Sequence, residues 1–209
     1  MKESYKTVKH MATDEIVEKR SRFIADVKPV ETEEEAVAFL EEIKKKYWDA
    51  RHHVYAYILE ENNIQRYSDD GEPAGTAGVP VLDMIKKEGL TNLIVVVTRY
   101  FGGIKLGAGG LVRAYSKSVL ETLSIAEIVD MELYEIFSFT FEYQHIKTID
   151  SEIRAKNLAV VEKQYEANVI YFVASNNVDM VKNIQDKLAN EVKIEHLGSR
   201  FLEKIDNKA

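Results

Sequence analysis

The chain has 209 residues, 45% hydrophobic and 30% charged, which is enough for one large domain or two smaller ones with a core each. Its formal net charge of -7 argues against a protein that coats nucleic acid through a broadly basic surface. The absence of cysteine excludes disulfides, thiolate metal sites and a cysteine nucleophile. Residues 1–20 lack the apolar core of a signal peptide and no apolar run could span a bilayer, so we expect a cytoplasmic protein with no membrane partner.

The N-terminal part opens with three short β-like runs, at 5–8, 15–18 and 23–27. A helix then starts at Thr32, whose hydroxyl forms a capping box with Glu35. Acidic residues fill the first turn and three lysines close the helix, an arrangement that the macrodipole favours at both ends.

A predicted β-hairpin follows, with alternating apolar runs at 54–59 and 64–67 around a polar turn. The next segment, SDDGEPAGTAGVP at 68–80, is too flexible for a helix or strand and too long for a simple turn. Loops of this length in compact domains often carry function. A short helix, a buried strand and a longer helix are predicted after it, at 81–87, 93–98 and 109–123.

Beyond Asp130 the composition changes, since no glycine occurs until Gly198. The pattern becomes strand, helix, strand, strand, helix, strand, at 136–143, 145–157, 160–165, 169–174, 178–188 and 193–201. This is the order of a ferredoxin-like βαββαβ unit. We therefore predict an α+β chain with its boundary between Asp130 and Glu135, divided into domains 1–132 and 133–209.

The segment TRYFGGIKLGAGGLVRAYSKS, at 98–118, holds five of the ten glycines and four cations with no acidic residue. A strand, a glycine loop and a helix start form the geometry that binds phosphate, because free N–H groups and the helix dipole face the anion. We therefore predict an anion- or nucleic-acid-binding site here. Its candidate residues are Arg99, Tyr100, Gly102, Gly103, Lys105, Gly107, Gly109, Gly110, Arg113 and Lys117.

Nucleotide motifs fit this segment poorly. A Walker loop needs Lys and then Ser or Thr after Gly107, where Ala108 and Gly109 stand, and the dinucleotide pattern needs glycine where Val112 stands. We therefore expect no nucleotide and no other cofactor. Three plainer interpretations stay open: tight backbone packing for the glycines, a solvated helix face for Arg113 and Lys117, and a core role for the aromatic residues.

The loop at 68–80 offers carboxylates that could bind a divalent metal or, with His52 or His53, act as a general acid and base. Turn formation explains the same residues equally well. Adjacent strand residues face opposite sides, so at most one of the two histidines is expected at a shared site with Arg51. We assign no catalytic residue and no metal ligand, and mark as a second motif Asp69, Asp70, Gly71, Glu72, Gly75 and Thr76.

Together, SDDGEPAGTAGVP and VVVTRYFGGIKLGAGGLVRAYSKSV resemble the YigZ/IMPACT family, and with the C-terminal pattern almost the whole chain is accounted for. The resemblance implies an N-terminal α/β sandwich of the type seen in the second domain of small-subunit ribosomal protein five, followed by a ferredoxin-like domain. That pair is similar to two consecutive domains of elongation factor G, which contact the ribosome. The eukaryotic members regulate translation under amino-acid starvation, and the family has no agreed catalytic residues.

Two hypotheses remain open at this point. The first is a non-enzymatic regulator of translation that binds a ribosome, an RNA or an acidic translation-factor partner through the glycine segment. The second is a metal-assisted hydrolase of a phosphate-containing substrate, with Asp69, Asp70 and Glu72 as metal ligands. The choice depends on whether the two motifs share one cleft and on what their charged groups contact.

Overall fold

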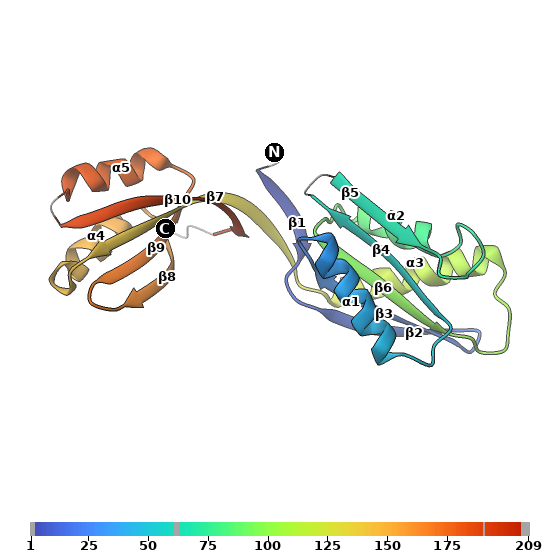
Figure 1. Ribbon diagram of the computed structural model, residues 1–209. Coiled ribbons are helices and arrows are strands. Elements are labelled where there is room, and N and C mark those ends of the chain that lie inside the picture. The colour runs from blue at the N-terminus through green and yellow to red at the C-terminus, as the bar shows by residue number, and fades with distance from the viewer. Residues whose placement is uncertain (1–2, 61–62, 190, 206–209) are drawn as a thin grey trace. The chain divides into compact units, whose positions relative to one another are not determined.

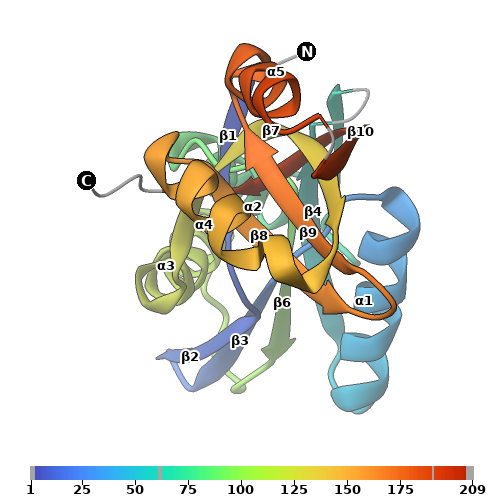
Figure 2. The same ribbon diagram turned by 90° about the vertical axis from the view of Figure 1, so that its left-hand side faces the viewer.

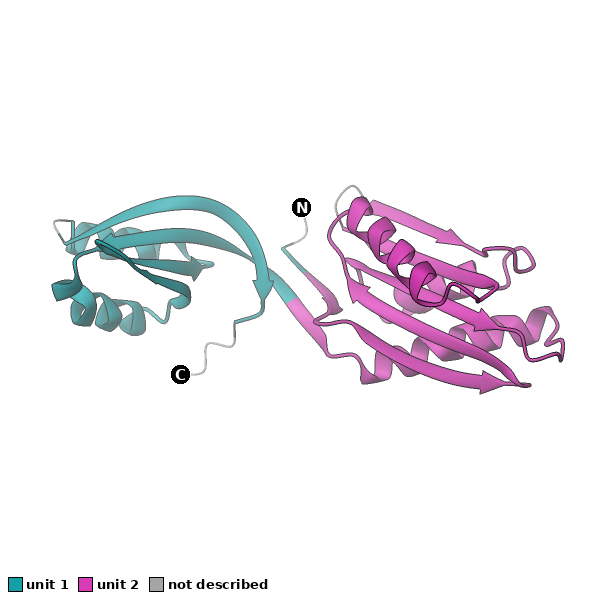
Figure 3. Ribbon diagram, turned by 60° about the horizontal axis from the view of Figure 1, so that its bottom comes forward, with its two compact units in different colours: residues 1–4, 131–209 teal, residues 5–130 magenta. Residues whose placement is uncertain are grey.

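The structure of the protein is a computed structural model that describes residues 3–60, 63–189 and 191–205 (Figure 1). The chain divides into two compact units, residues 5–130 and residues 131–209 with the first four residues (Figure 3). Both combine helices with strands, so the expectation of a mixed α/β chain in two parts is confirmed at that level. Among the described residues, no helix has the length and apolar character needed to cross a membrane.

The unit formed by residues 5–130 is built on a five-stranded antiparallel sheet with the order β2-β3-β6-β4-β5. Its helix α1 packs on one face of the sheet, and α2 and α3 pack on the other (Figure 2). The elements are β1 (Ser4–Val8), β2 (Ala12–Glu18), β3 (Ser21–Pro29), α1 (Glu33–Lys46), β4 (His52–Leu59), β5 (Ile64–Ser68), α2 (Gly78–Lys87), β6 (Leu93–Tyr100) and α3 (Ala108–Ile125).

Burial on both faces explains the apolar character of β6, which lies at the centre of this sheet. Val95 and Val97 pack into the core under α2 and α3, whereas Ile94 and Val96 pack into the core under α1. A strand with one solvated face would alternate in polarity, but this one is covered on both sides and is apolar throughout. It ends in the glycine segment, and so the central strand of the sheet fixes where that segment begins.

Helix α1 shows how local sequence sets its own limits. The hydroxyl of Thr32 accepts a hydrogen bond from the Glu35 N–H at 3.2 Å. The Glu35 carboxylate reaches back to the N–H of Glu31 at 2.7 Å, one residue before the donor of a standard capping box. The helix ends at Lys46, and Tyr47 is its C-cap.

The unit formed by residues 131–209 contains a second antiparallel sheet, in which β10-β7-β9-β8 are neighbours in that order. Buried side chains of the strands and of two helices form its core, with Phe139, Tyr171, Ile149 and Ile184 fully buried. The elements are β7 (Ile128–Phe141), α4 (Ile146–Ala155), β8 (Ala159–Tyr165), β9 (Val169–Ser175), α5 (Val178–Lys187) and β10 (Val192–Glu203).

The first strand of this unit differs from the sequence prediction. Strand β7 starts at Ile128, eight residues before the predicted start, and stops at Phe141, two residues before the predicted end. It therefore runs without a break through the range where the sequence placed the domain boundary. Pairing with β10 explains the part from Met131 onward, because the ladder places Met131 opposite Glu203 and satisfies backbone groups in the range where the boundary was predicted.

Candidate functional site

The two predicted motifs meet in one cleft of about 410 Å³ at the end of the sheet in the unit of residues 5–130. We call it the motif cleft. Glu72 and Pro73 come from the loop before α2, and a run from Arg99 to Leu111 comes from the end of β6, the glycine loop and the first turn of α3. Arg51 and His52, at the start of β4, complete the lining, because His52 is the register partner of Arg99. The two motifs are thus joined in space.

A buried ion pair links the motifs across this cleft. Arg99 donates from Nη1 to Glu72 Oε1 at 2.5 Å, and both side chains are more than nine-tenths buried. The Tyr115 hydroxyl on α3 donates to the same carboxylate oxygen at 2.8 Å, and burial, then the Glu72 charge, raises the pKa of Tyr115. The Arg99 guanidinium also lies over the Phe23 and Phe101 rings, at 5.3 and 5.6 Å from their centroids. Arg99, predicted to bind an anion, is therefore held by Glu72.

The aspartates of the second motif support the loop rather than face the cleft. Asp69 Oδ1 accepts hydrogen bonds from the N–H groups of Ala77 and Gly78 at 3.0 and 2.8 Å, and Oδ2 accepts one from Gly75 at 2.9 Å. It thus caps the N-terminus of α2, whose own N-cap residue has no side-chain hydrogen bond. Asp70 Oδ2 accepts from the backbone N–H of His53 at 2.5 Å. Among the described residues, no group of three His, Asp or Glu side chains is placed to hold a metal ion.

The two histidines of β4 lie on opposite sides of the sheet, as strand alternation requires. His52 lines the motif cleft, and its Nδ1–H donates to the Asp70 carbonyl oxygen at 2.7 Å. Because that hydrogen bond fixes the tautomer, Nε2 of the neutral ring is an acceptor. His53 is buried, its Nδ1 lies 3.2 Å from the Thr98 hydroxyl, and burial lowers its pKa.

The five glycines of the segment divide into two groups. A Cβ on Gly102 would lie 2.0 Å from the backbone carbon of Arg20, and one on Gly110 would lie 2.9 Å from Leu106 Cβ. These two glycines are needed for close packing. The other three have open space where a Cβ would point: Gly103 and Gly107 meet nothing within 4 Å, and Gly109 meets only Arg113 Nη1 at 3.8 Å. They leave the entrance to α3 accessible.

The N-terminus of α3 is open and lies in a positive environment. Gly107 is its N-cap, with φ of 73°, so no side chain caps the helix, and its first turn has no acidic residue. The N–H groups of the first turn have no intrahelical acceptor. Lys105 lines the cleft beside them, and Arg113 extends over the first turn. Lys117, by contrast, pairs with Glu18 at 3.0 Å on the helix surface.

The aromatic residues of the segment are divided between the two faces of the sheet end. Phe101 lines the motif cleft and is half exposed. The Tyr100 hydroxyl donates to Asp49 Oδ1 at 2.7 Å, and desolvation together with that carboxylate raises the pKa of Tyr100 to about 12. The predicted anion-binding set did not include Phe101 or Arg51, although the sequence analysis expected Arg51 at a shared site with one of the two histidines. The structure places both residues in the lining of the motif cleft.

Both motifs lie inside a match to a known family. The family model for the Impact N-terminal domain matches residues 19–123. The chain belongs to the IMPACT family. IMPACT family member YvyE of Bacillus subtilis (strain 168) is 48% identical over 170 residues, which cover 81% of this chain and 78% of that protein. IMPACT family member YigZ of Escherichia coli (strain K12) is 35% identical over 159 residues, 75% and 78% of the two chains. The sequence identification of the YigZ/IMPACT family is confirmed.

A solved structure resembles this IMPACT family chain along almost its whole length. It is described as "Crystal structure of an hypothetical protein", is 30% identical, and covers 93% of this chain and 97% of its own, with a TM-score of 0.64. The similarity therefore extends through the unit of residues 131–209 as well as through the part that the family model matches.

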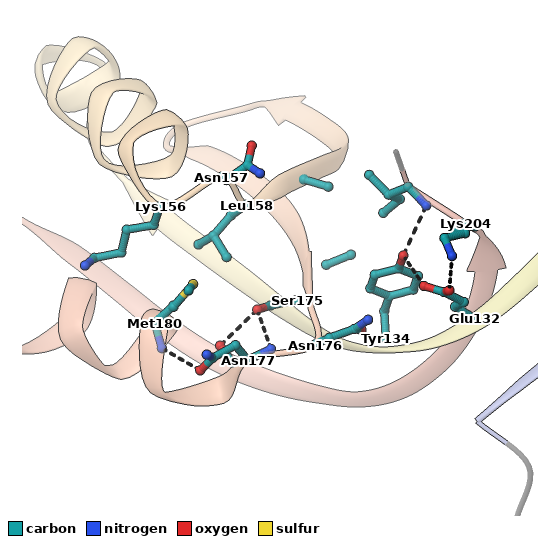
Figure 4. Close-up of a pocket in the computed structure, with 13 residues that line it drawn as sticks. Glu132, Tyr134, Lys156, Asn157, Leu158, Ser175, Asn176, Asn177, Met180 and Lys204 are labelled. Carbon is teal, nitrogen blue, oxygen red and sulfur yellow. Dashed lines mark hydrogen bonds and ion pairs between the residues drawn. The ribbon is translucent and has the colours of Figure 1, made fainter. Parts of the chain in front are cut away.

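That C-terminal unit of the IMPACT family chain has a cavity of its own, of about 390 Å³ (Figure 4). Tyr134 stands in it with its hydroxyl donating to Glu132 Oε2 at 3.0 Å and accepting from the N–H of Ile205 at 3.1 Å. Glu132 in turn pairs with Lys204 at 3.0 Å. Glu132 and Lys204 offset one another, and Lys156 also lines the cavity, so its lining has an excess of one positive charge against two in the motif cleft.

Proposed function

We propose that this chain is a non-enzymatic binding protein that regulates translation, and that the motif cleft holds a phosphate or carboxylate of a ribosome, an RNA or an acidic protein partner. Membership of the IMPACT family supports the link to translation, because the eukaryotic members of the family regulate translation. The anion-binding part rests on one observation, the excess of positive charge beside an uncapped helix N-terminus.

The charge balance of the cleft supports an anionic ligand. Arg51, Arg99 and Lys105 line it together with a single carboxylate, Glu72. The ion pair between Arg99 and Glu72 cancels two of these charges, and neither Arg51 nor Lys105 makes an ion pair with any described residue. Arg113, over the first turn of α3, is likewise without one. An anion placed at the helix N-terminus would gain from the dipole and from these cations.

The hydrogen bonds made by the carboxylates of the second motif weigh against metal-assisted hydrolysis. Asp69, Asp70 and Glu72 are the ligands that it would need, and each is hydrogen-bonded to a different part of the fold. A metal would have to break the α2 cap or the buried ion pair to recruit them. We therefore assign the chain no catalytic residue, no metal and no cofactor.

The finer structural assignments are also proposals. We infer that the C-terminal part is a ferredoxin-like domain, which its βαββαβ chain order and the strand order β10-β7-β9-β8 support. We assign the N-terminal part to the class of the second domain of small-subunit ribosomal protein five, with domain limits at 1–132 and 133–209, and we place the protein in the cytoplasm.

Co-sedimentation with ribosomes over a range of salt concentrations tests the proposed function. The Arg51→Gln, Lys105→Gln double variant should bind more weakly, and its affinity should fall less steeply with salt, by about one unit of log–log slope for each phosphate that the variant no longer neutralises. The Lys86→Gln, Lys87→Gln variant is the control, because it makes the same change of charge in the last turn of α2. No binding at low salt, or equal weakening in the control, would refute the proposal.

A further inference from the structure

The loop between α1 and β4 presents an aromatic side chain to solvent. Trp48 is the single tryptophan of the chain, and with 81% of its surface exposed it is the most exposed large hydrophobic residue among those that the structure describes. Tryptophan is usually highly buried, because its large surface is costly to leave in water. An exposed tryptophan therefore needs an explanation.

The turn that carries Trp48 is fixed. The Ala50 N–H donates to the Tyr47 carbonyl oxygen at 2.9 Å, and Asp49 accepts from the Tyr100 hydroxyl at 2.7 Å. Arg22 lies over the Tyr100 ring, 5.2 Å from its centroid. The loop is thus attached to the end of β6, and Trp48 extends from a well-supported turn.

This turn precedes, along the chain, a residue that lines the motif cleft. Three residues after Trp48 stands Arg51, which lines the cleft, and a chain of that length spans at most about 11 Å. The loop from α1 to β4 and the loop from β6 to α3 lie at the same end of the sheet (Figure 1). The half-exposed Phe101 lines the cleft itself. Phe101 therefore lies beside the cations of the motif cleft, and Trp48 stands on the neighbouring turn, which Tyr100 holds on the other face of the same sheet end.

We propose that this end of the sheet binds single-stranded nucleic acid, with a phosphate at the N-terminus of α3 beside Arg51 and Lys105 and a base stacked on Trp48. Surfaces that bind single strands combine a positive groove with aromatic platforms, because every base has a flat face to stack. An acidic protein segment would also match the cations, and the measurements below separate it from a single strand. A duplex would offer phosphates, but its bases are already stacked. The inference deepens the proposed function and rests on it.

Trp48 is also the natural reporter of such binding, since no other tryptophan contributes to the fluorescence of the chain. We expect an oligouridylate of about eight nucleotides, within the range of ~4–16 that such sites cover, to quench this fluorescence in a saturable manner. The same oligonucleotide annealed to oligoadenylate should quench it far less.

Substitution separates stacking from charge. The Trp48→Ala variant should bind a labelled oligouridylate about 5- to 150-fold more weakly, the decrease expected for one stacked base, and Trp48→Phe should recover part of that affinity. Because Trp48 is so exposed, the far-UV circular dichroism of the variant should be unchanged. Tyr165→Ala in β8 is the matched control, because Tyr165 is also exposed, at 58%, and lies in the other unit.

Each contrary result has a distinct meaning. If Trp48→Ala binds as tightly as the unaltered chain while the Arg51→Gln, Lys105→Gln variant does not, the inference is overturned and the proposed function stands. Equal affinity for single strand and duplex also overturns it. If the chain binds ribosomes but no oligouridylate, the inference fails and the proposed function stands, with paired RNA or a protein surface as the partner. If it binds neither, the inference and the proposed function fail together.

Discussion

The buried pair between Arg99 and Glu72 gives the sharpest test of how the two motifs are joined. In the variant Glu72→Ala, the Arg99 guanidinium loses its carboxylate partner at 2.5 Å, and the Tyr115 hydroxyl loses its acceptor at 2.8 Å. Solvent cannot replace either group easily, because the side chains of Arg99 and Glu72 are 7% and 4% exposed. An unpaired charge would be left inside the fold.

The expected cost is large for one substitution. Removing one partner of a buried ion pair costs about 3–5 kcal/mol, mainly because the other charge stays buried without compensation. The broken tyrosine hydrogen bond adds to this, although interactions in one network do not add independently. A destabilisation of that size corresponds to a fall in melting temperature of roughly 10–20 °C for a domain of this size.

Urea unfolding followed by far-UV circular dichroism measures the change. The control is Glu18→Ala, because the Glu18 and Lys117 side chains form an ion pair of 3.0 Å but are 38% and 51% exposed. That variant should be destabilised by less than about 1 kcal/mol. If Glu72→Ala were as stable as the control, Arg99 would not depend on Glu72, and its assignment as a structural residue rather than a ligand-binding one would be wrong.

Two further predictions concern the same region. Gly102→Ala should be destabilised by at least about 2 kcal/mol, because its Cβ would lie 2.0 Å from the Arg20 backbone. Gly109→Ala, by contrast, should leave stability unchanged or raise it by up to about 1 kcal/mol. Thermal melts of the two variants test this difference, and equal melting temperatures would contradict it. Burial lowers the pKa of His53 below its ordinary 6.5, so the stability it contributes is complete above pH 6.5 and is lost as pH falls through the lower folded value. His53→Gln should make the free energy of unfolding change less with pH between 7 and 5. Urea titrations across that range measure this, and the same change with pH in the variant as in the unaltered chain would contradict the prediction.

Features set by near neighbours in the chain were predictable from the sequence. The start of α1 follows from Thr32 and Glu35, which are hydrogen-bonded within one turn, and its predicted limits agree with the structure. The β4–β5 hairpin is equally local, since Leu59 at the end of one strand pairs with Ile64 at the start of the next. In these segments the residues that decide the structure are all present in one window of sequence.

Features set by distant partners were not. Residues 131–135 lie before the start of the strand that the sequence predicts, and they belong to β7 because β10, more than sixty residues later, pairs with them. The pairing of Arg99 with Glu72 is similar, because 27 residues separate them and neither charge shows its partner in the sequence. The sequence analysis therefore located both motifs but could not tell which of their charges were already used within the fold.

That distinction changes what the acidic motif contributes. Asp69 caps α2, and Glu72 holds Arg99 and Tyr115, so the acidic residues fix β6, α2 and α3 relative to one another at the end of the sheet. Arg51 and Lys105, which form no ion pair within the described part of the chain, then border an uncapped helix N-terminus of fixed geometry. Preorganised donors bind an anion without a further ordering cost. The acidic loop thus acts on the ligand indirectly: its substitutions should weaken binding only as far as they unfold the site, whereas substitutions of these two cations should weaken it in a folded protein.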